Sequence, residues 1–522
     1  MIFRSPHPDV DLREEPFTDF VLEPADRMPD EPAIIEGPSG RVMTFGELRD
    51  SARAAASGLA DRGLQKGDVV AIVSPNVPEY AVAFNAVASA GGVNTTVNPL
   101  ATVDELAHQF NDSAARFLIT VPSLAEKARQ VAGRTAIEEV FVFGEMEGAT
   151  PFADLLRPHG PPPTVEIDPR EDLVALPYSS GTTGLPKGVM LTHFNLVANI
   201  CQAIPMVPSG PGDRVIAVLP FFHIYGMVVV MSAMLRVGST LVTLPRFELE
   251  EFLRTIQEYR VNRIFAVPPI VLALAKHPAV DDYDLSAVEW VMSGAAPLGQ
   301  EVASACAERL GCHVFQGYGL TEASPVTHTR PPESADEKLA SVGPCIPNTE
   351  MLIADLESGE PLGAGAEGEV WLRGPQIMKG YLNNAEATAA TVDQEGWLHT
   401  GDIGLIDEDG YLSIIDRAKE LIKYKGYQIA PAELEAVLLS HPAVADAAVI
   451  PSPDDEAGEV PKAFVVLKGE TGEKDLLDYV AERVAPYKKI RRLAFVEAVP
   501  KSASGKILRR LLVAEERARM TE

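Results

Sequence analysis

The sequence predicts an α/β protein with a large N-terminal domain of several subdomains and a small α+β C-terminal domain. Three observations support this prediction: the chain has 522 residues, strand-like and helix-like runs alternate over most of it, and their pattern changes after residue 416. One hydrophobic core does not grow to this length, so at least two domains are expected. A composition of 46% hydrophobic and 23% charged residues is typical of a globular protein.

The N-terminal domain, residues 1–416, is expected to contain two α/β sheets. Four strand-like runs, GDVVAIVSPN, GDRVIAVLP, VNRIFAVPP and AVEWVMSGAAP, are each followed by a helix-like run. Repeated strand–turn–helix units are typical of folds with largely parallel sheets. From Val342 onwards, short strands separated by glycine turns replace this pattern, which predicts a small β subdomain.

The C-terminal domain, residues 417–522, follows a hinge that we place near residues 416–419. Its apolar runs predict an α+β unit. The expected helices and strands lie over residues 432–440, 474–483, 443–450 and 463–466.

Net charge limits the partners of this chain. A formal charge of −29 disfavours non-specific binding to nucleic acids or to anionic membranes. The stretch 487–510 is an exception, because its eight basic residues stand against a single acidic residue, Glu497. This stretch is either a docking surface for a polyanion or a solvated helix face with a tail.

The chain has no feature of a secreted or membrane protein. Its first residues, MIFRSPHPDVDLREEPF, contain no apolar signal run. The longest apolar run, residues 224–235, is too short to span a bilayer and is expected to be a buried helix. Four cysteines in so long a chain do not form a disulfide framework. A cytoplasmic enzyme is therefore expected.

Residues 176–193, LPYSSGTTGLPKGVMLTH, place a loop of hydroxyl groups, glycines and one lysine between two strand-like runs. Glycines let the backbone approach a bulky anion, and hydroxyls, free N–H groups and a lysine can bind its oxygens. The loop is not a Walker A motif, because Gly188 follows Lys187 where Ser or Thr is required. It predicts a nucleotide site of another architecture, and the alternative is an ordinary hairpin loop. The candidate phosphate-binding residues are Ser179, Ser180, Gly181, Thr182, Thr183, Gly184 and Lys187.

Other polar stretches suit the rest of a nucleotide. QGYGLTEAS offers Tyr318 to a base, Thr321 to a phosphate and Glu322 as a hard oxygen ligand for Mg²⁺. GWLHTGDIG sets Asp402 where a carboxylate can accept both ribose hydroxyls, and PKSASGKILRR places Lys506 on a Ser/Gly-rich loop before a basic helix. Each stretch alone also fits a structural turn, whereas their order along one chain favours a nucleotide-binding enzyme.

The chain resembles the adenylate-forming superfamily in these motifs and in three more, FFHIYGM, LIKYKGYQIAPAELEAVL and VAPYKKIRRLAFVEAVPKSASGKILRR. The resemblance covers essentially the whole chain and is greatest to the 4-coumarate–CoA ligases and their bacterial relatives. It implies a mobile C-terminal domain and an ATP-dependent carboxylate–CoA ligase that works in two steps. The acid first attacks the α-phosphorus of ATP to give acyl-AMP and pyrophosphate, and the CoA thiol then displaces AMP. The expected ligands are ATP, Mg²⁺, CoA as cosubstrate and a small carboxylic acid.

The resemblance also implies roles in the first step. The loop 179–188 would hold the β- and γ-phosphates, Thr321 the α-phosphate and Glu322 the Mg²⁺. Lys506 would bridge the carboxylate of the acid and the α-phosphate. The residues expected to line the adenine and the ribose are Gln316, Gly317, Tyr318, Asp402 and Arg417.

For the second step, the family rotates its small domain, and Lys419 matches the hinge position. Lys423 and Gln428 match residues implicated in catalysis in coumarate ligases. Lys425 and Gly426 match contacts to CoA.

The acyl pocket determines which acid is used. His223 matches a histidine that gates this pocket and orients the carboxylate; the alternative is a satisfied core histidine. Plant coumarate ligases carry a lysine at the position of Met292 and a serine at that of Val229, and both can meet a ring hydroxyl. An apolar pocket does not reward a hydroxyl for losing its water, so cinnamate is expected to be used as well as 4-coumarate or better, and caffeate less well. By resemblance the pocket is lined by Tyr225, Val229, Met292, Ala295, Gly319, Pro325 and Val326.

Other functions remain open from the sequence. A ligase of medium- or long-chain fatty acids fits the same motifs and an apolar pocket. An amino-acid adenylation domain would need an acidic residue at His223. A fatty-acyl-AMP ligase for a carrier protein would normally carry an extra insertion, and a non-catalytic acyl-nucleotide binding protein would be expected to lack Lys506 or Glu322.

Overall fold

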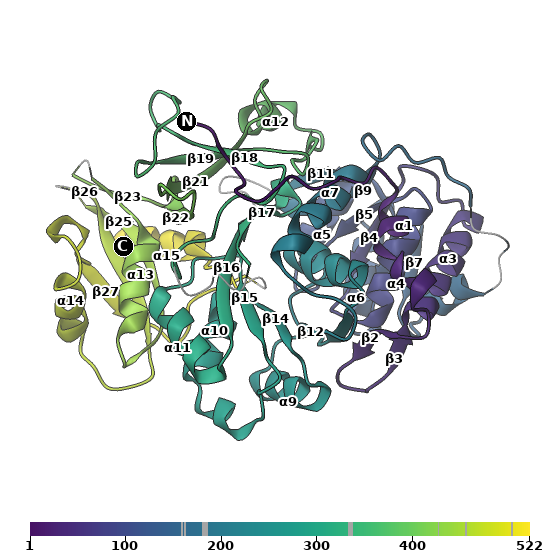
Figure 1. Ribbon diagram of the computed structural model, residues 1–522, viewed down its shortest axis with the longest axis horizontal. Helices are drawn as coiled ribbons and strands as arrows, with labels where there is room; N and C mark the ends of the chain where they lie inside the picture. The colour runs from purple at the N-terminus through teal and green to yellow at the C-terminus, as the bar shows by residue number, and fades with distance from the viewer. Residues whose placement is uncertain are drawn as a thin grey trace.

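The computed structural model describes residues 1–157, 160, 163–179, 186–331, 338–425, 427–454, 457–502 and 505–521. The described residues form four sheets, three in the N-terminal part and one in the C-terminal part (Figure 1). Two of the N-terminal sheets are covered by helices and the third is antiparallel. The predicted fold class, a large α/β domain of several sheets followed by a small domain, is confirmed.

The first sheet is nine-stranded and lies with its helices at the right of Figure 1. Strands β4 to β8 are parallel, because the chain returns through a helix or a loop after each strand. At the other edge β11 runs antiparallel to its neighbours β9, β10 and β20. The strands are β4 (Val69–Val73), β5 (Val93–Thr96), β6 (Ala115–Thr120), β7 (Glu139–Val142), β8 (Thr150–Pro151), β9 (Leu173–Ala175), β10 (Tyr178–Ser179), β11 (Lys187–Thr192) and β20 (Gly380–Tyr381).

The helices of this region begin in different ways. Three of them, α3, α5 and α7, open with a capping box in which the threonine hydroxyl accepts the N–H three residues later. The helices are α1 (Phe17–Val21), α2 (Pro24–Arg27), α3 (Phe45–Asp61), α4 (Pro78–Ser89), α5 (Val103–Asp112), α6 (Ala125–Ala132) and α7 (His193–Ala203).

The second sheet is eight-stranded, and its central strands are also parallel. Parallel strands direct their carboxyl ends to one edge of a sheet, which is where α/β proteins bind ligands. The strands are β2 (Pro32–Glu36), β3 (Val42–Thr44), β12 (Arg214–Ala217), β13 (Thr240–Thr243), β14 (Arg263–Ala266), β15 (Trp290–Ser293), β16 (His313–Gly319) and β17 (Val326–Thr329). The helices are α8 (Met234–Arg236), α9 (Leu249–Tyr259), α10 (Pro268–Lys276) and α11 (Gln300–Leu310).

The third sheet is the predicted β subdomain, at the top of Figure 1. Its strands pair antiparallel, and the last of them, β22, ends one residue past the boundary that we place at residue 416. The elements are β1 (Phe3–Arg4), β18 (Glu350–Ala354), β19 (Glu367–Arg373), α12 (Ala385–Thr391), β21 (Leu398–Ile406) and β22 (Leu412–Arg417).

The C-terminal part has hydrophobic clusters of its own, separate from the large cluster that joins the first two sheets. The two expected helices and two expected strands are present, and the hairpin of β23 and β24 and strand β27 add to them. The elements are β23 (Ile422–Tyr424), β24 (Tyr427–Ile429), α13 (Pro431–Ser440), β25 (Val444–Asp454), β26 (Gly458–Leu467), α14 (Glu473–Ala481), β27 (Arg492–Phe495) and α15 (Arg509–Thr521).

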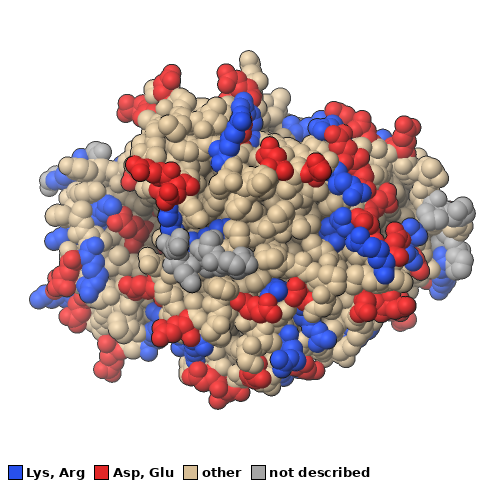
Figure 2. Space-filling model, in the orientation of Figure 1, with Lys and Arg blue, Asp and Glu red and all other residues tan. Residues whose placement is uncertain are grey.

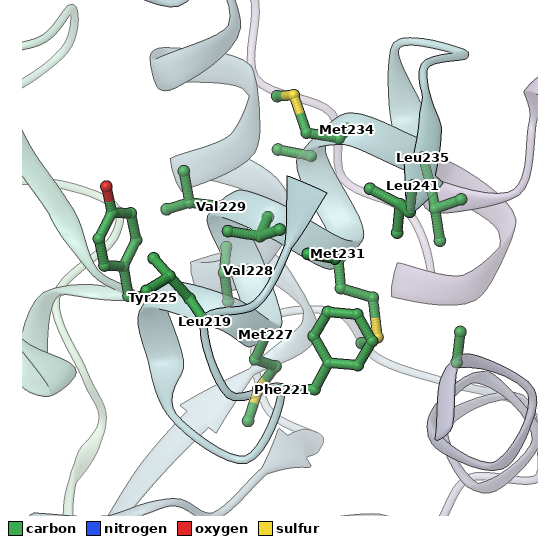
Figure 3. Packing of buried hydrophobic residues seen from close by; sticks show 14 of the residues in the cluster. Leu219, Phe221, Tyr225, Met227, Val228, Val229, Met231, Met234, Leu235 and Leu241 are labelled. Atoms are coloured by element: carbon green, nitrogen blue, oxygen red, sulfur yellow. The ribbon is translucent and has the colours of Figure 1, made fainter. Parts of the chain in front are cut away.

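The apolar run 224–235 is buried and helical, as expected, but it is not a regular α-helix. Residues Tyr225–Ala233 form a π-helix, and α8 completes the run. In this wide turn the hydroxyl of Ser232 donates to the carbonyl of Met227, five residues earlier (2.7 Å). Figure 3 shows the side chains of the run packed in the core. Apolar composition predicts burial but cannot distinguish a π-helix from an α-helix.

A glycine is required at the start of this π-helix. A Cβ atom at Gly226 would lie 2.1 Å from the carbonyl oxygen of Pro220, so the backbone must move to admit it. We expect Gly226→Ala to lower the free energy of unfolding by about 2 kcal/mol or more, as overpacked cores do. Gly210→Ala is the matched control, because no atom lies within 4 Å of a Cβ there. Thermal unfolding of both variants tests this, and equal midpoints would contradict it.

Candidate active site

Lys506 lies where the C-terminal part meets the N-terminal part. Its ammonium group is within electrostatic range of Glu322, Asp402 and Arg417. Burial lowers the pKa of Lys506, and the charge of Arg417 lowers it further, whereas Asp402, Glu322 and Glu420 raise it. The structure therefore brings Lys506 near charged residues that lie far from it in the sequence.

The loop that carries Lys506 is closed by Ser502 and rests on α10. The N–H of Lys506 donates to the hydroxyl of Ser502 (3.1 Å), and the N–H of Ser502 donates to the carbonyl of Lys506 (2.8 Å). Gly505, in the left-handed region with φ 79°, faces Val267 and Pro269 at the start of α10. A Cβ at Gly505 would be 3.1 Å from the Val267 side chain, so the loop and the helix are in close contact.

Arg509 fixes the helix that follows this loop. It is the first residue of α15, and its guanidinium pairs with Glu420, next to the hinge residue Lys419, and with Glu435 of α13 (2.7 Å). Burial raises the pKa of Glu435, while Arg509 and the N–H of Val449 oppose that rise. The ion pairs of Arg509 with Glu420 and Glu435, which we call the Arg509 bracket, join α15, α13 and the segment after the hinge.

Asp402 and Arg417 face each other on neighbouring strands. They are opposite in the pairing of β21 with β22, and their side chains form an ion pair (3.3 Å). The hydroxyl of Tyr318, on β16, donates to the other oxygen of Asp402 (2.5 Å). Burial raises the pKa of Asp402, whereas Arg417, Tyr318 and Lys506 lower it. An aromatic ring, a carboxylate and a guanidinium thus form one wall of the site.

Gln316 and Gly317 precede Tyr318 on β16, but their side chains or backbone contact other parts of the protein than Tyr318 does. The Gln316 amide is buried and binds main-chain atoms of Leu298 and Leu339, so it braces the backbone. A Cβ at Gly317 would lie 2.4 Å from the terminal methyl of Met292. The candidate adenine residues and the candidate acyl pocket are therefore in direct contact.

Glu322 is buried and is held by Tyr381. It belongs to a short 3₁₀ turn, Thr321–Ala323, whose first residue Thr321 is half-buried. The hydroxyl of Tyr381 donates to Oε1 of Glu322 (2.8 Å), and the Lys187 ammonium lies 4.8 Å from the Tyr381 ring centroid. Tyr381 is missing from our sequence-based candidates, because it lies in the two-residue strand β20, outside the polar motifs of the sequence.

The candidate phosphate-binding loop begins and ends at described residues. Ser179 and Lys187 are opposite each other in the pairing of β10 with β11. The remaining candidates lie outside the described residues: Ser180, Gly181, Thr182, Thr183 and Gly184 in this loop, and Gly426 in the β23–β24 hairpin.

His223 follows the carboxyl end of β12. Its Nδ1 accepts the N–H of Tyr225 (3.3 Å), so the proton of the neutral ring is on Nε2. Burial, and secondarily the charge of Lys506, lower the pKa of His223 to about 3. The histidine is therefore neutral at ordinary pH and can donate one hydrogen bond from Nε2.

The candidate acyl pocket is apolar. Tyr225, Val229, Met292 and Val326 are buried, and the Tyr225 hydroxyl donates to the carbonyl of Met292 (3.3 Å). The backbone of the remaining pocket residues is constrained. Ala295 lies in the left-handed region with φ 71°. A Cβ at Gly319 would lie 2.2 Å from the carbonyl oxygen of Pro325.

The residues matched to the second step lie apart from the charged cluster. Lys419, Lys423, Lys425 and Gln428 are all exposed. Lys423 and Gln428 face each other across the β23–β24 hairpin.

The basic stretch 487–510 is not a free cationic surface. Several of its cations form ion pairs inside the C-terminal part: Lys488 with Glu433, Arg492 with Asp454, Lys501 with Asp446, and Arg509 with Glu420 and Glu435. Figure 2 likewise shows basic and acidic side chains interspersed. Among the described residues, four of its eight cations are therefore paired within the C-terminal part, which leaves less positive charge for a polyanion than the sequence suggests.

Two family models match the chain. Residues 21–382 match the AMP-binding enzyme family, and residues 433–506 match the AMP-binding enzyme C-terminal domain. The chain therefore belongs to the AMP-binding, adenylate-forming enzymes. None of the described helices has the length and apolar composition needed to cross a bilayer.

Similarity to curated proteins assigns the chain to a narrower class of enzyme. The chain is 44% identical to 4-coumarate–CoA ligase 2 of Oryza sativa subsp. japonica, over 98% of this chain and 95% of that protein. It is 43% identical to 4-coumarate–CoA ligase of Pinus taeda, over 98% and 96%. It is accordingly an acid–thiol ligase of the 4-coumarate–CoA ligase-like, AMP-forming family.

Solved structures share the whole fold. The anthranilate CoA ligase AuaEII with anthranoyl-AMP gives a TM-score of 0.90 at 26% identity, covering 98% of both chains. ATP-bound MatB from Rhodopseudomonas palustris gives 0.86 at 28% identity, covering 95% of this chain and 98% of that one. o-Succinylbenzoate CoA synthetase of Bacillus subtilis, with its acyl-adenylate, gives 0.82 at 31% identity, covering 96% and 98%.

The Arg509 bracket can be tested directly. Arg509→Ala leaves Glu420 and Glu435 without their cation, and breaking a buried ion pair costs about 3 kcal/mol or more. We expect the C-terminal part of this variant to unfold at a lower temperature than in the wild type. Calorimetry and limited proteolysis measure this midpoint. The neighbouring Arg510→Ala is the control, because Arg510 is exposed and no ion pair is recorded for it among the described residues. Equal midpoints in the two variants would contradict this role.

Proposed function

We propose that this chain makes the CoA thioesters of cinnamate- and 4-coumarate-type aryl acids through an enzyme-bound acyl-adenylate. The position of Lys506 among Glu322, Asp402 and Arg417 is the observation that carries the proposal. Similarity to 4-coumarate–CoA ligases over 98% of the chain supports the choice of aryl acids.

In the first step, an oxygen of the substrate carboxylate attacks the α-phosphorus of ATP and pyrophosphate leaves. Lys506 holds the carboxylate and the α-phosphate together and offsets the negative charge that gathers on the phosphate oxygens. His223 donates from Nε2 to the carboxylate. Thr321 binds the α-phosphate, and Lys187 with its loop binds the departing β- and γ-phosphates.

The nucleoside binds beside β16. The main chain of residues 316–318 and the Tyr318 ring line the adenine. Asp402 accepts the ribose hydroxyls, and Arg417 forms an ion pair with this carboxylate.

Glu322 fits a divalent cation. It is a buried carboxylate, and no lysine or arginine forms an ion pair with it among the described residues. The described residues contain no cluster of three histidine, cysteine or carboxylate side chains. A cation there would have one protein ligand plus phosphate oxygens, which is how Mg²⁺ usually binds nucleotides. Bound Mg²⁺ would neutralise charge on the triphosphate.

In the second step, the C-terminal domain, residues 417–522, turns about the hinge at residues 416–419. Lys506 withdraws, and the β23–β24 hairpin with Lys423 and Gln428 approaches the adenylate. Lys425 and Gly426 contact CoA, whose thiol attacks the acyl carbon and releases AMP. The exposure of the hairpin in the structure agrees with an arrangement suited to the first step.

A panel of acids tests the substrate. Pyrophosphate and AMP release would be measured with cinnamate, 4-coumarate, caffeate, benzoate and saturated acids, each with and without CoA. We expect CoA-dependent turnover, strongest on cinnamate and 4-coumarate and weaker on caffeate, because Met292 and Val229 offer no partner to a ring hydroxyl. Met292→Lys should raise the ratio of 4-coumarate to cinnamate turnover about tenfold, with Met227→Leu in the core as the control.

Two results would contradict the proposal. Turnover strongest on medium-chain saturated acids would indicate a fatty-acyl-CoA ligase, which the apolar lining also fits. Adenylate formed without a CoA-dependent product would indicate a carrier protein as the acceptor.

The charge of Lys506 predicts the pH dependence of the first step. Lys506 must be protonated to act, and its pKa is lowered from the usual 10.5. As pH rises through this lowered pKa the cation is lost, so single-turnover adenylation without CoA should fall at a pH below 10.5. Lys506→Arg keeps its charge at any working pH and should lose this alkaline fall, although its rate is lower. A wild-type rate unchanged up to the usual lysine pKa would contradict the prediction.

A further inference from the structure

The segment 378–381 holds Glu322 at two points. The N–H of Met378 donates to the main-chain carbonyl of Glu322 (2.9 Å), and the Tyr381 hydroxyl donates to its Oε1 (2.8 Å). Both the backbone and the carboxylate of Glu322 are therefore fixed by one short stretch of chain. Oε2 is the oxygen to which Tyr381 makes no bond.

The same segment pairs with the strand that begins at Lys187. Tyr381 is opposite Val189 in the pairing of β20 with β11, and the N–H of Leu382 donates to the carbonyl of Gly188 (2.8 Å). This register brings the Tyr381 ring to Lys187, whose ammonium lies 4.8 Å from the ring centroid. Such a distance is within the range of a cation–π contact.

Tyr381 is buried, with 8% of its surface exposed, and it stays a hydrogen-bond donor at working pH. Burial, and secondarily the charge of Glu322, raise the pKa of its phenol. Its hydroxyl therefore restricts the Glu322 carboxylate in one orientation, and its ring restricts the lysine.

We propose that Tyr381 is a positioning residue that couples Lys187 to Glu322, so that the triphosphate and its divalent cation are bound in one fixed arrangement. The inference rests on the proposed function, which assigns these two side chains to the phosphates and to Mg²⁺. Each contact of Tyr381 then has its own consequence. The hydroxyl governs the apparent affinity for Mg²⁺, and the ring governs the affinity for the triphosphate.

Two variants separate these contacts. Tyr381→Phe removes the hydroxyl and keeps the ring, so the Mg²⁺ concentration for half-saturation at fixed ATP should rise about tenfold. Tyr381→Leu also removes the ring, so the half-saturating concentration of ATP at saturating Mg²⁺ should rise about threefold as well. Mg²⁺ and ATP binding would be measured by calorimetry without any acid, so that no turnover occurs.

Tyr178→Phe is the matched control. The Tyr178 ring packs against Gly188 of β11, the strand that also pairs with Tyr381. The Tyr178 hydroxyl donates to Asp112 (2.7 Å), not to Glu322. This variant loses the same kind of bond beside β11 and should bind Mg²⁺ as the wild type does. An equal shift in Tyr178→Phe and Tyr381→Phe would mean general loosening and would overturn the proposal, as would no shift in Tyr381→Phe.

A double variant tests whether Tyr381 acts through Glu322. In a Glu322→Gln background, adding Tyr381→Phe should leave the Mg²⁺ requirement unchanged, because the partner of the hydroxyl no longer carries the charge. A further full shift would overturn the coupling. The acid panel of the wild type is a separate measurement, so failure of the proposed reaction and failure of this inference remain distinguishable.

Discussion

The active site depends on one electrostatic arrangement, a lysine from the C-terminal part placed among carboxylates of the N-terminal part. Burial and Arg417 lower the pKa of Lys506 there, and Asp402, Glu322 and Glu420 oppose that fall. The Ser502 turn, the contact of Gly505 with α10 and the Arg509 bracket all serve to hold Lys506. A charge held this way is oriented before any ligand arrives, which is what stabilising a charged transition state requires.

In the proposed function, the nucleotide and the acid bind to adjoining strands of one sheet. Met292 at the end of β15 faces the acyl side, and its methyl lies against Gly317 of β16 on the adenine side. His223, from the loop after β12, lies near Lys506. In the proposed reaction, the carboxylate of the acid and the α-phosphate of ATP meet at the same edge of the parallel sheet.

The sequence was sufficient to predict the fold class, because strand–helix alternation and the change of pattern after residue 416 are local signals. It also supplied the candidate charged residues Glu322, Asp402 and Lys506, since each lies in a compact polar motif. It could not show Tyr381, which acts through a strand pairing with residues far away in the chain. Nor could composition show that the Gln316 amide braces the backbone, or that four of the eight cations between 487 and 510 form ion pairs with residues that the structure describes. These are long-range contacts, which periodicity and spacing do not encode.

The Arg509 bracket has a consequence for the order of the reaction. In the proposed rotation, Arg509, Glu420 and Glu435 travel together, because all three follow Lys419 in the chain. Turning therefore leaves that bracket intact and releases mainly the attraction that holds Lys506 in place. In the proposed cycle, ATP strengthens this attraction and the departure of pyrophosphate weakens it. Loss of pyrophosphate would then free the C-terminal domain to turn, so that the CoA thiol is admitted only after the adenylate has formed.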